Sequence, residues 1–339
     1  MRRKLLRKEC AVALLILFCI GGFQYQVLAD TLEPINIRET IYVDDDAECP
    51  GHGTLSAPYC SIQYAIDNAD DDDDIKIASG EYFENILIDK EITLDWHGED
   101  INGTDTGIPI INGEGIGIVV IIRASDVIIK KCSIMNSGLT DLDAGIYVGE
   151  ESSDVTILNN EISECYYGIW IKRYTVLETN HDIRGNIIDN IEEDGIILSL
   201  SDGNSIYDNI VTNCGLHGIQ LLDCNENRIK ENILQNNGYG LVVDVGIENE
   251  VELNTCENNT EYGLVVVNTQ KTVITNNNFL NNDVGQATWI NCLGDKWFHN
   301  YWGRPMFFLH IIGGLLRGAD ISFPWFKIEL NPSSSPNTP

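Results

Sequence analysis

The phrase Asn186-Ile-Ile-Asp-Asn recurs five more times at nearly constant spacing, as Asn209-Ile-Val-Thr-Asn, Asn232-Ile-Leu-Gln-Asn, Asn254-Thr-Cys-Glu-Asn, Asn277-Asn-Phe-Leu-Asn and Asn300-Tyr-Trp. The steps between these phrases are 23, 23, 22, 23 and 23 residues. A second series, of glycines from Gly145 to Gly285, keeps nearly the same period. Because one unit of this length cannot bury its apolar face alone, it must stack on the next unit, and the period therefore predicts a solenoid.

The residues inside each period indicate strands and turns. Short β-branched runs such as Thr156-Ile-Leu and Ile196-Ile-Leu are separated by Asn, Gly, Asp and Ser, and no apolar stretch is long enough for a helix. Helical repeats need about 33 residues or more, and the regular leucines of leucine-rich repeats are absent. A unit of 22 or 23 residues with three short strands predicts an all-β fold in which each unit is one turn of a parallel β-helix.

The recurring asparagines are predicted to stabilise the turns of this stack. Coils stack about 4.8 Å apart, so an Asn at one turn meets its counterparts above and below. Its amide can donate to one neighbour and accept from the other, and Asn tolerates the left-handed backbone of tight turns. The expected structural ladder consists of Asn186, Asn209, Asn232, Asn254, Asn277 and Asn300.

Residues 1–29 have the features of a secretory signal peptide. Five basic residues precede an apolar run from Ala11 to Ile20, and Val27-Leu-Ala29 offers small side chains for cleavage before Asp30. The apolar run is short for a membrane span, and an uncleaved anchor is the alternative. We therefore expect a secreted, extracellular or cell-surface protein, periplasmic in an organism with two membranes, with no transmembrane helix after the signal is removed.

The charge of the chain argues against one class of partner. The sequence holds 21 Lys and Arg against 52 Asp and Glu, a formal net charge of −31. Without residues 1–29, 16 basic side chains face 51 acidic ones. This balance excludes nucleic acid as a partner, because phosphate binding needs a basic face. We interpret the acidic surface as a solubility coat for a secreted setting.

The segment before the regular repeats carries a second pattern. Ile41-Tyr-Val-Asp-Asp-Asp is followed by a short amphipathic stretch, Ser61–Ala69, in which Ser61 is a good N-cap, and then by successive strands from Asp74. This pattern resembles the N-terminal cap and first coils of right-handed parallel β-helix proteins of the pectin-lyase-like superfamily. The resemblance extends from about residue 41 to 303. It implies one right-handed solenoid of about ten coils.

The expected domain organisation follows from the signal, the repeats and the end of the periodicity. Residues 1–29 are the signal peptide, residues 30–303 form the β-helix with its N-terminal capping helix, and residues 304–339 form an apolar C-terminal cap with a frayed tail. A solenoid of this length needs no second core, since it grows by adding coils.

The resemblance is closest to the branch with NosD-type and carbohydrate-binding or sugar-hydrolase repeats, which is common in secreted and cell-surface proteins. Its repeats are specific for the fold and only weakly specific for function. The catalytic motifs of polygalacturonases are not assembled, because Gly51-His52-Gly53 lies some 176 residues before Arg228-Ile-Lys230. We therefore predict a non-catalytic protein that presents a sheet face to carbohydrate or other extracellular polymers.

Other functions are kept as alternatives. The first is a polysaccharide lyase or glycoside hydrolase of the same superfamily. The second is a structural surface-layer component or a NosD-type metal-associated protein. The six His residues are scattered and there are only three Met, so a copper site has little support. The sequence does not indicate the oligomeric state.

One place brings aromatic and basic residues together beside a break in the period. The step from Gly168 to Gly195 is 27 residues, about four longer than the others. If Trp170 points outward, it would form a platform for an acidic sugar, and if it points inward it belongs to the core. The candidate substrate-binding residues are Tyr167, Trp170, Lys172, Arg173 and His181, with Tyr166 and Tyr174 beside them.

Two further sites are expected near the N-terminal end. Cys49 and Cys60 flank a loop rich in Gly and Pro and could form a disulfide in an oxidising compartment. Acidic runs supply the oxygen ligands that calcium prefers, although solvated charge is the simpler interpretation. The candidate calcium ligands are Asp44, Asp45, Asp46, Asp72, Asp73 and Asp74.

Overall fold

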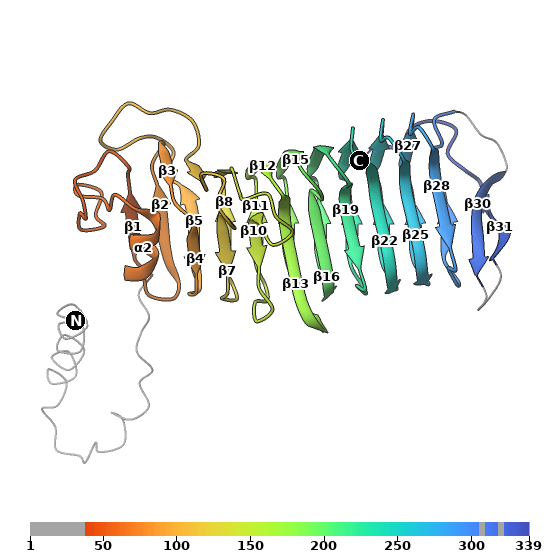
Figure 1. Ribbon diagram of the computed structural model, residues 1–339, viewed down its shortest axis with the longest axis horizontal. Helices are drawn as coiled ribbons and strands as arrows, with labels where there is room; N and C mark the ends of the chain where they lie inside the picture. The colour runs from red at the N-terminus through yellow and green to blue at the C-terminus, as the bar shows by residue number, and fades with distance from the viewer. Residues whose placement is uncertain (1–37, 305–308, 318–321, 339) are drawn as a thin grey trace, which may run out of the picture. The chain divides into compact units, whose positions relative to one another are not determined.

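The computed structural model describes residues 38–304, 309–317 and 322–338. These residues form a stack of coils in which the chain passes through three short strands in each turn (Figure 1). Strands at the same position in successive coils pair in parallel and in register, which gives three columns of strands. The predicted all-β parallel solenoid of about ten coils is confirmed.

The three columns differ in the lengths of their strands. The first column, whose strands are the longest of each coil from β13 onward, holds β4 (Ile86–Ile88), β7 (Val120–Ile122), β10 (Ala144–Val148), β13 (Tyr167–Glu178), β16 (Ile196–Asp202), β19 (His217–Leu222), β22 (Tyr239–Ile247), β25 (Tyr262–Gln270) and β28 (Gly285–Ile290). The second column holds β1 (Thr40–Val43), β2 (Asp73–Ile77), β5 (Ile92–Trp96), β8 (Ile128–Lys130), β11 (Thr156–Leu158), β14 (Asp182–Arg184), β17 (Ser205–Tyr207), β20 (Arg228–Lys230), β23 (Glu250–Glu252), β26 (Val273–Thr275) and β29 (Lys296–Phe298). The third column holds β3 (Glu81–Phe83), β6 (Ile110–Asn112), β9 (Ser133–Met135), β12 (Glu161–Cys165), β15 (Ile187–Ile191), β18 (Ile210–Cys214), β21 (Ile233–Gln235), β24 (Thr255–Glu257) and β27 (Asn278–Leu280).

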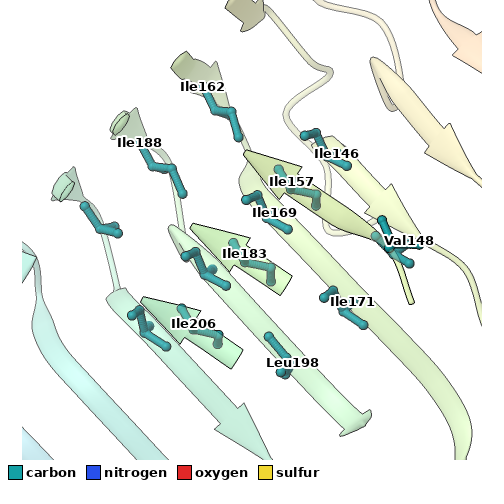
Figure 2. Close-up of a cluster of buried hydrophobic side chains, with 14 of the residues drawn as sticks. Ile146, Val148, Ile157, Ile162, Ile169, Ile171, Ile183, Ile188, Leu198 and Ile206 are labelled. Atoms are coloured by element: carbon teal, nitrogen blue, oxygen red, sulfur yellow. The ribbon is translucent and has the colours of Figure 1, made fainter. Parts of the chain in front are cut away.

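The core lies inside the coils and is built from stacked rows of aliphatic side chains. In the second column, Ile157, Ile183 and Ile206 occupy matching positions on β11, β14 and β17, and each is fully buried (Figure 2). Ile162 and Ile188 form the corresponding row in the third column. Since each of these rows continues from coil to coil, burial of apolar surface stabilises the stack along its whole length.

Asparagines form a ladder of hydrogen bonds at the corner between the second and third columns. The Nδ2 of Asn209 donates to the carbonyl oxygen of Ile183 (2.9 Å) and to the Oδ1 of Asn232 (3.0 Å). Burial of these amides would be costly without partners. The members of the ladder, all buried, are Asn160, Asn186, Asn209, Asn232, Asn254, Asn277 and Asn300.

Two shorter ladders that the sequence analysis did not identify occupy the other corners. In each, the main-chain N–H of one Asn donates to the Oδ1 of the Asn in the next coil. One ladder, Asn204, Asn227 and Asn249, lies between the first and second columns, and the other, Asn237, Asn259 and Asn282, lies between the third and first columns.

At the N-terminal end, helix α2 (Ile62–Asn68) packs against β1 and β4. Ser61 caps it by accepting from the main-chain N–H of Tyr64, and the Glu84 carboxylate accepts from Ser61 Oγ and from the N–H groups of the first helical turn. The helix buries the apolar face predicted from the sequence. Cys49 and Cys60 are joined by a disulfide in the loop before the helix.

At the other end, β30 (Leu309–Arg317) and β31 (Ser322–Leu330) form an antiparallel pair, the terminal hairpin. β30 pairs with β28 and β31 pairs with β29, so the hairpin follows the last coil. Glu329 ends the long Asn ladder, because its Oε1 accepts from the main-chain N–H of Asn300 (2.7 Å) and its Oε2 accepts from the Nε1 of Trp302 (2.6 Å).

The predicted signal peptide, residues 1–29, lies outside the described residues. Among the residues that are described, no helix has the length and apolar character needed to span a membrane.

Candidate functional site

The outer side of the first column carries the candidate site. Side chains alternate along a strand, and on β13 Ile169 and Ile171 are fully buried inside the coil. Trp170 and Lys172 therefore project from the opposite, outer side of the sheet. The strand register places Trp170 beside Tyr147 of β10 and beside Ile197 of β16.

Four rings and one ammonium group meet on this surface, and we call them the aromatic cluster: Tyr147, Tyr167, Trp170, Lys172 and Tyr174. The ring centroids of Tyr147 and Tyr167 lie 5.1 and 5.2 Å from that of Trp170. The Lys172 Nζ lies 4.9 Å from the Trp170 centroid and 5.7 Å from the Tyr174 centroid, within range of cation–π attraction. A cation is thus held over an aromatic surface in an otherwise acidic protein.

The members of the aromatic cluster differ in exposure. Trp170 is only 8% exposed, because Ala144 and Ile197 pack against it on the outer face, whereas Tyr174 is 66% exposed. The structure therefore combines the two arrangements considered for Trp170: the ring projects outward, and its neighbours cover it. Tyr174 and Lys172 offer the accessible surface, and Trp170 supports them.

Arg173 and His181 make other contacts. The Nη1 of Arg173 donates to the carbonyl oxygen of Ser152 (2.8 Å). His181 is 1% exposed and belongs to the Asn204 ladder: its main-chain N–H donates to Asn204 Oδ1 (2.9 Å), and its Nδ1 accepts from the N–H of Val155 (3.2 Å). Burial, aided by the positive charge of Arg173, lowers the pKa of His181 to about 4. A neutral, buried ring is a structural element rather than a ligand contact.

The extra residues after Lys172 lengthen a strand. β13 runs to Glu178, and its pairing with β16 shifts register between Lys172 and Leu177. The insertion thus extends the outer face of the first column at the position where Tyr174 is exposed.

An Asp–His pair that sequence reasoning missed lies next to the aromatic cluster. The Oδ1 of Asp194, a 3% exposed residue, accepts from the Nδ1 of His217 (2.7 Å) and from its main-chain N–H (3.1 Å). The His217 ring lies 5.3 Å from the ring of Tyr239. Asp194 also acts on Tyr167 of the aromatic cluster: burial of the Tyr167 phenol and the negative charge of Asp194 raise the pKa of Tyr167 to about 12.

A signal for this pair was present in the sequence. Asp194 and His217 are 23 residues apart, one full period, as are Tyr147 and Trp170. Residues separated by one period are neighbours on adjacent strands. A search for chemically complementary residues at that spacing would have found both contacts.

The chemistry of the Asp–His pair is that of a positioned imidazole. The bond to Asp194 engages Nδ1, so Nε2 is the nitrogen left to bind a ligand or exchange a proton. His217 begins β19, two strands along the first column from β13, so rings for stacking, a cation and a positioned imidazole lie within a few strands of one another.

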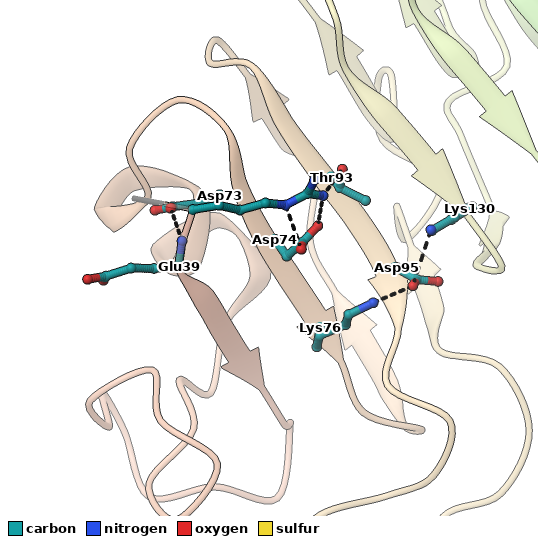
Figure 3. Close-up of polar contacts among 8 residues, drawn as sticks. Glu39, Asp73, Asp74, Lys76, Thr93, Asp95 and Lys130 are labelled. Atoms are coloured by element: carbon teal, nitrogen blue, oxygen red, sulfur yellow. Dashed lines mark hydrogen bonds and ion pairs between the residues drawn. The ribbon is translucent and has the colours of Figure 1, made fainter. Parts of the chain in front are cut away.

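The two acidic runs lie at opposite ends of the pair formed by β1 and β2. Asp74 pairs with Thr40 in register, whereas Asp44 follows Val43 at the other end. Asp74 accepts from the Nε of Arg38 (2.8 Å), and Asp73 accepts from the main-chain N–H of Glu39 (Figure 3). Asp73 also accepts from the main-chain N–H of Asp70. Asp72 lies in the turn that precedes β2. The six predicted calcium ligands thus do not converge on one site.

The first acidic run has different neighbours. Asp44 and Asp46 lie with Asp100, each with a carboxylate oxygen within 4.8 Å of the others. Both oxygens of the buried Asp44 accept main-chain N–H groups, from Asp46 and Asn102, and its burial raises its pKa. Asp45 accepts instead from the N–H of Glu81. These contacts tie the loop after β1 to Asn102 and to β3, and a calcium-binding role for Asp44 and Asp46 stays a prediction.

Comparisons with known proteins agree with this architecture. Residues 115–284 match the family described as right handed beta helix region. The chain is 28% identical over 142 residues to the probable ABC transporter binding protein NosD of Pseudomonas aeruginosa, a match that covers 41% of this chain and 29% of that protein. The matched part is thus less than a third of the length of that relative.

Solved structures resemble the fold at low sequence identity. The mannuronan C-5 epimerase AlgE4 A-module of Azotobacter vinelandii is 18% identical with a TM-score of 0.59, and 77% of this chain and 79% of that chain are covered. The complex of XylC with xylose is 12% identical with a TM-score of 0.61, covering 77% and 68%. Since the family match spans half of the chain, this protein belongs to the right-handed β-helix family.

Proposed function

We propose that this protein binds an extracellular polysaccharide along the outer face of the first column. The observation that carries the proposal is the aromatic cluster, in which the Lys172 ammonium lies near the rings of both Trp170 and the exposed Tyr174. Aromatic faces stack on sugar rings through their apolar sides, and the cation would attract a carboxylate or sulfate group.

The geometry of the columns supports an extended ligand. The residues from Tyr147 on β10 to Tyr239 on β22 lie on five successive strands of the first column. At about 4.8 Å per strand, they span about 19 Å along the stack, enough for an oligosaccharide rather than a single sugar. The structurally similar proteins include one named for mannuronan epimerisation and one solved with xylose, which favours a carbohydrate ligand.

We further propose that the protein is exported, as residues 1–29 suggest. The Cys49–Cys60 disulfide favours an oxidising compartment, because cytosolic thiols are normally kept reduced. Detection of the chain with a new N-terminus at Asp30 in the extracellular or periplasmic fraction would support export, and an intact chain confined to the cytosol would contradict it.

Binding is tested with a glycan array followed by titration calorimetry on the best glycan. Tyr174→Ala and Lys172→Gln should each weaken binding at least tenfold without lowering the melting temperature, since Tyr174 is exposed and Lys172 lies at the surface. Phe83→Ala removes a 58% exposed aromatic ring from the third column and serves as the matched control. Equal affinities for all four proteins, or no binding to any acidic or neutral glycan, would contradict the proposal.

The Asp–His pair favours a second function, proton transfer to or from the bound polysaccharide. A histidine oriented by a buried carboxylate is suited to general acid–base chemistry. Such an enzyme would release reducing ends or unsaturated uronides from the polymer. His217→Ala should then abolish release while the exposed His52→Ala retains it; a product yield no different between these variants excludes this function.

A further inference from the structure

A line of aromatic and polar side chains crosses the beginnings of the first-column strands. The pairing registers of this column bring one such side chain from each of five successive coils into line. We call this line the tyrosine row, and its members, in order along the stack, are Tyr167, Asp194, His217, Tyr239 and Tyr262. The row ends at small residues, since Tyr167 pairs with Ala144 and Tyr262 with Gly285. It is therefore a bounded feature that spans about 19 Å, at about 4.8 Å per coil.

Three rings of the tyrosine row form a continuous surface. The ring centroids of His217 and Tyr239 lie 5.3 Å apart. Burial, with the charges of Glu261 and the neighbouring Tyr262, raises the pKa of Tyr239, so the two tyrosines are close to each other. A Cβ atom at Gly285 would lie 2.7 Å from the Cε1 of Tyr262, so only a glycine leaves room for this ring. His217, Tyr239 and Tyr262 are all partly exposed and lie outside the buried core.

The tyrosine row is separate from the accessible part of the aromatic cluster. Lys172 lies five residues further along β13 than Tyr167, and Tyr174 lies beyond it. At about 3.3 Å per residue, Lys172 is about 16 Å from the row along the strand. A sugar chain that follows the row crosses the strands and does not reach Lys172 or Tyr174.

The spacing of the tyrosine row suits a linear polysaccharide. Successive sugars of an extended chain are spaced about as far apart as successive coils, which are about 4.8 Å apart. Each tyrosine face can therefore stack on a different sugar of one chain. The Nε2 of His217, which Asp194 does not engage, would meet a hydroxyl of a sugar between those on Tyr167 and Tyr239. The sugar over His217 would thus be an interior unit of the chain.

The charge around the tyrosine row selects the class of sugar. The segments that carry the row, 164–168, 191–195, 214–218, 236–240 and 259–263, contain no Lys or Arg. They do contain carboxylates, among them Glu193, which accepts from the Tyr166 hydroxyl (3.3 Å), and Glu261 beside Tyr262. Carboxylates accept hydrogen bonds from sugar hydroxyls but repel a uronate or a sulfate group. The row therefore fits uncharged sugars, in contrast to Lys172.

We propose that the tyrosine row is a second polysaccharide-binding site, which takes a linear chain of uncharged sugars and places an interior sugar over His217. This inference rests on the proposed function, because it assumes a polysaccharide on the outer face of the first column. It adds a site that is distinct from Lys172 and Tyr174, and it names the class of sugar that the Asp–His pair would meet.

The test is titration calorimetry of the full chain with xylo-, cello- and manno-oligosaccharides of two to six sugars. For the sugar type that binds, affinity should rise at least tenfold between two and five units, because more coils take part. Tyr262→Ala should weaken binding of the hexasaccharide at least tenfold, and Tyr262→Phe, which keeps the ring, should restore it. Tyr207→Ala removes a partly buried ring from the outer side of the second column and is the matched control.

Several results would overturn the proposal. One is an affinity for neutral oligosaccharides that does not change with their length, and another is a Tyr262→Ala variant that binds the hexasaccharide as tightly as the wild type. Binding of acidic oligosaccharides alone, weakened by Lys172→Gln, would also overturn it while the proposed function stands. Binding of no glycan would overturn both. If Tyr262→Ala does not fold, Gly285→Ala replaces it, because the added methyl group displaces the Tyr262 ring and should weaken binding in the same way.

Discussion

At the scale of single residues, the coils are joined by asparagine side chains whose amide groups form hydrogen bonds to the preceding coil and to the next one. The amide nitrogen of Asn209, for example, donates to the preceding coil and to the next one, and its Oδ1 accepts from the preceding coil, so the side chain is buried without an unpaired polar atom. One exposed Asn illustrates the contrast: Asn236 has a positive φ of 57° and faces solvent. The same residue type thus serves as buried ladder and as turn former.

We predict that Asn209→Leu destabilises the protein by about 3 kcal/mol, because the main-chain N–H and the side-chain amide of Asn186 and the carbonyl of Ile183 each lose a buried partner. Equilibrium denaturation measures the change. Asn236→Gly, at an exposed left-handed position, is the control and should change stability by no more than about 0.5 kcal/mol. Comparable losses in the two variants would show that the ladder contributes little.

His181 predicts a pH dependence. Its folded pKa of about 4 lies below the unfolded value of about 6.5, so the unfolded chain binds the proton more tightly. The stability is therefore fully present above pH 6.5 and falls as the pH drops toward 4, by about 3 kcal/mol from this residue. Denaturation at pH 7.5 and 4.5 should show a smaller acid loss for His181→Asn than for the wild type. The exposed His52→Asn should behave like the wild type, and a loss in His181→Asn as large as that of the wild type would refute the assignment.

Trp170 stabilises the outer face of the first column through its packing contacts. Because the ring is mostly covered, Trp170→Ala should lower stability by about 2 kcal/mol and also displace Lys172 and Tyr174. Thermal melting and glycan titration should both change. A melting curve identical to the wild type would mean that the neighbours do not depend on this ring.

At the scale of elements, the period predicted the columns because residues one period apart become cross-strand neighbours. The same rule predicted that Asn209 stacks on Asn232. A search for complementary side chains one period apart would also have paired Asp194 with His217. The period could not predict how exposed Trp170 is. Its exposure depends on how far the side chains of Ile197 and Tyr147 extend over the ring from the neighbouring strands. The terminal hairpin has no repeat, so its antiparallel pairing left no periodic signal.

Glu329 connects the terminal hairpin to the ladder. Glu329→Ala removes the acceptors of the Asn300 amide and the Trp302 indole, and we predict a loss of about 2–3 kcal/mol. Limited proteolysis should cut the C-terminal coils of the variant first, while residues near α2 stay resistant. Uniform sensitivity along the chain would argue that the hairpin does not protect this end.

At the scale of the whole molecule, an acidic solenoid presents the aromatic cluster and its lysine on a long parallel face. The coils hold that surface rigid, because every strand of the first column pairs with a strand on each side from β7 to β25. A rigid face loses little conformational entropy when a polymer binds, and that favours recognition of an extended chain.

A crystal structure of the protein with the best-binding oligosaccharide tests the central claim most directly. The account predicts sugar rings along the outer face of the first column, with one ring against Tyr174 and an acidic group within 4 Å of the Lys172 Nζ, about the limit for an ion pair. Sugar bound on the second or third column, with the aromatic cluster empty, would contradict it.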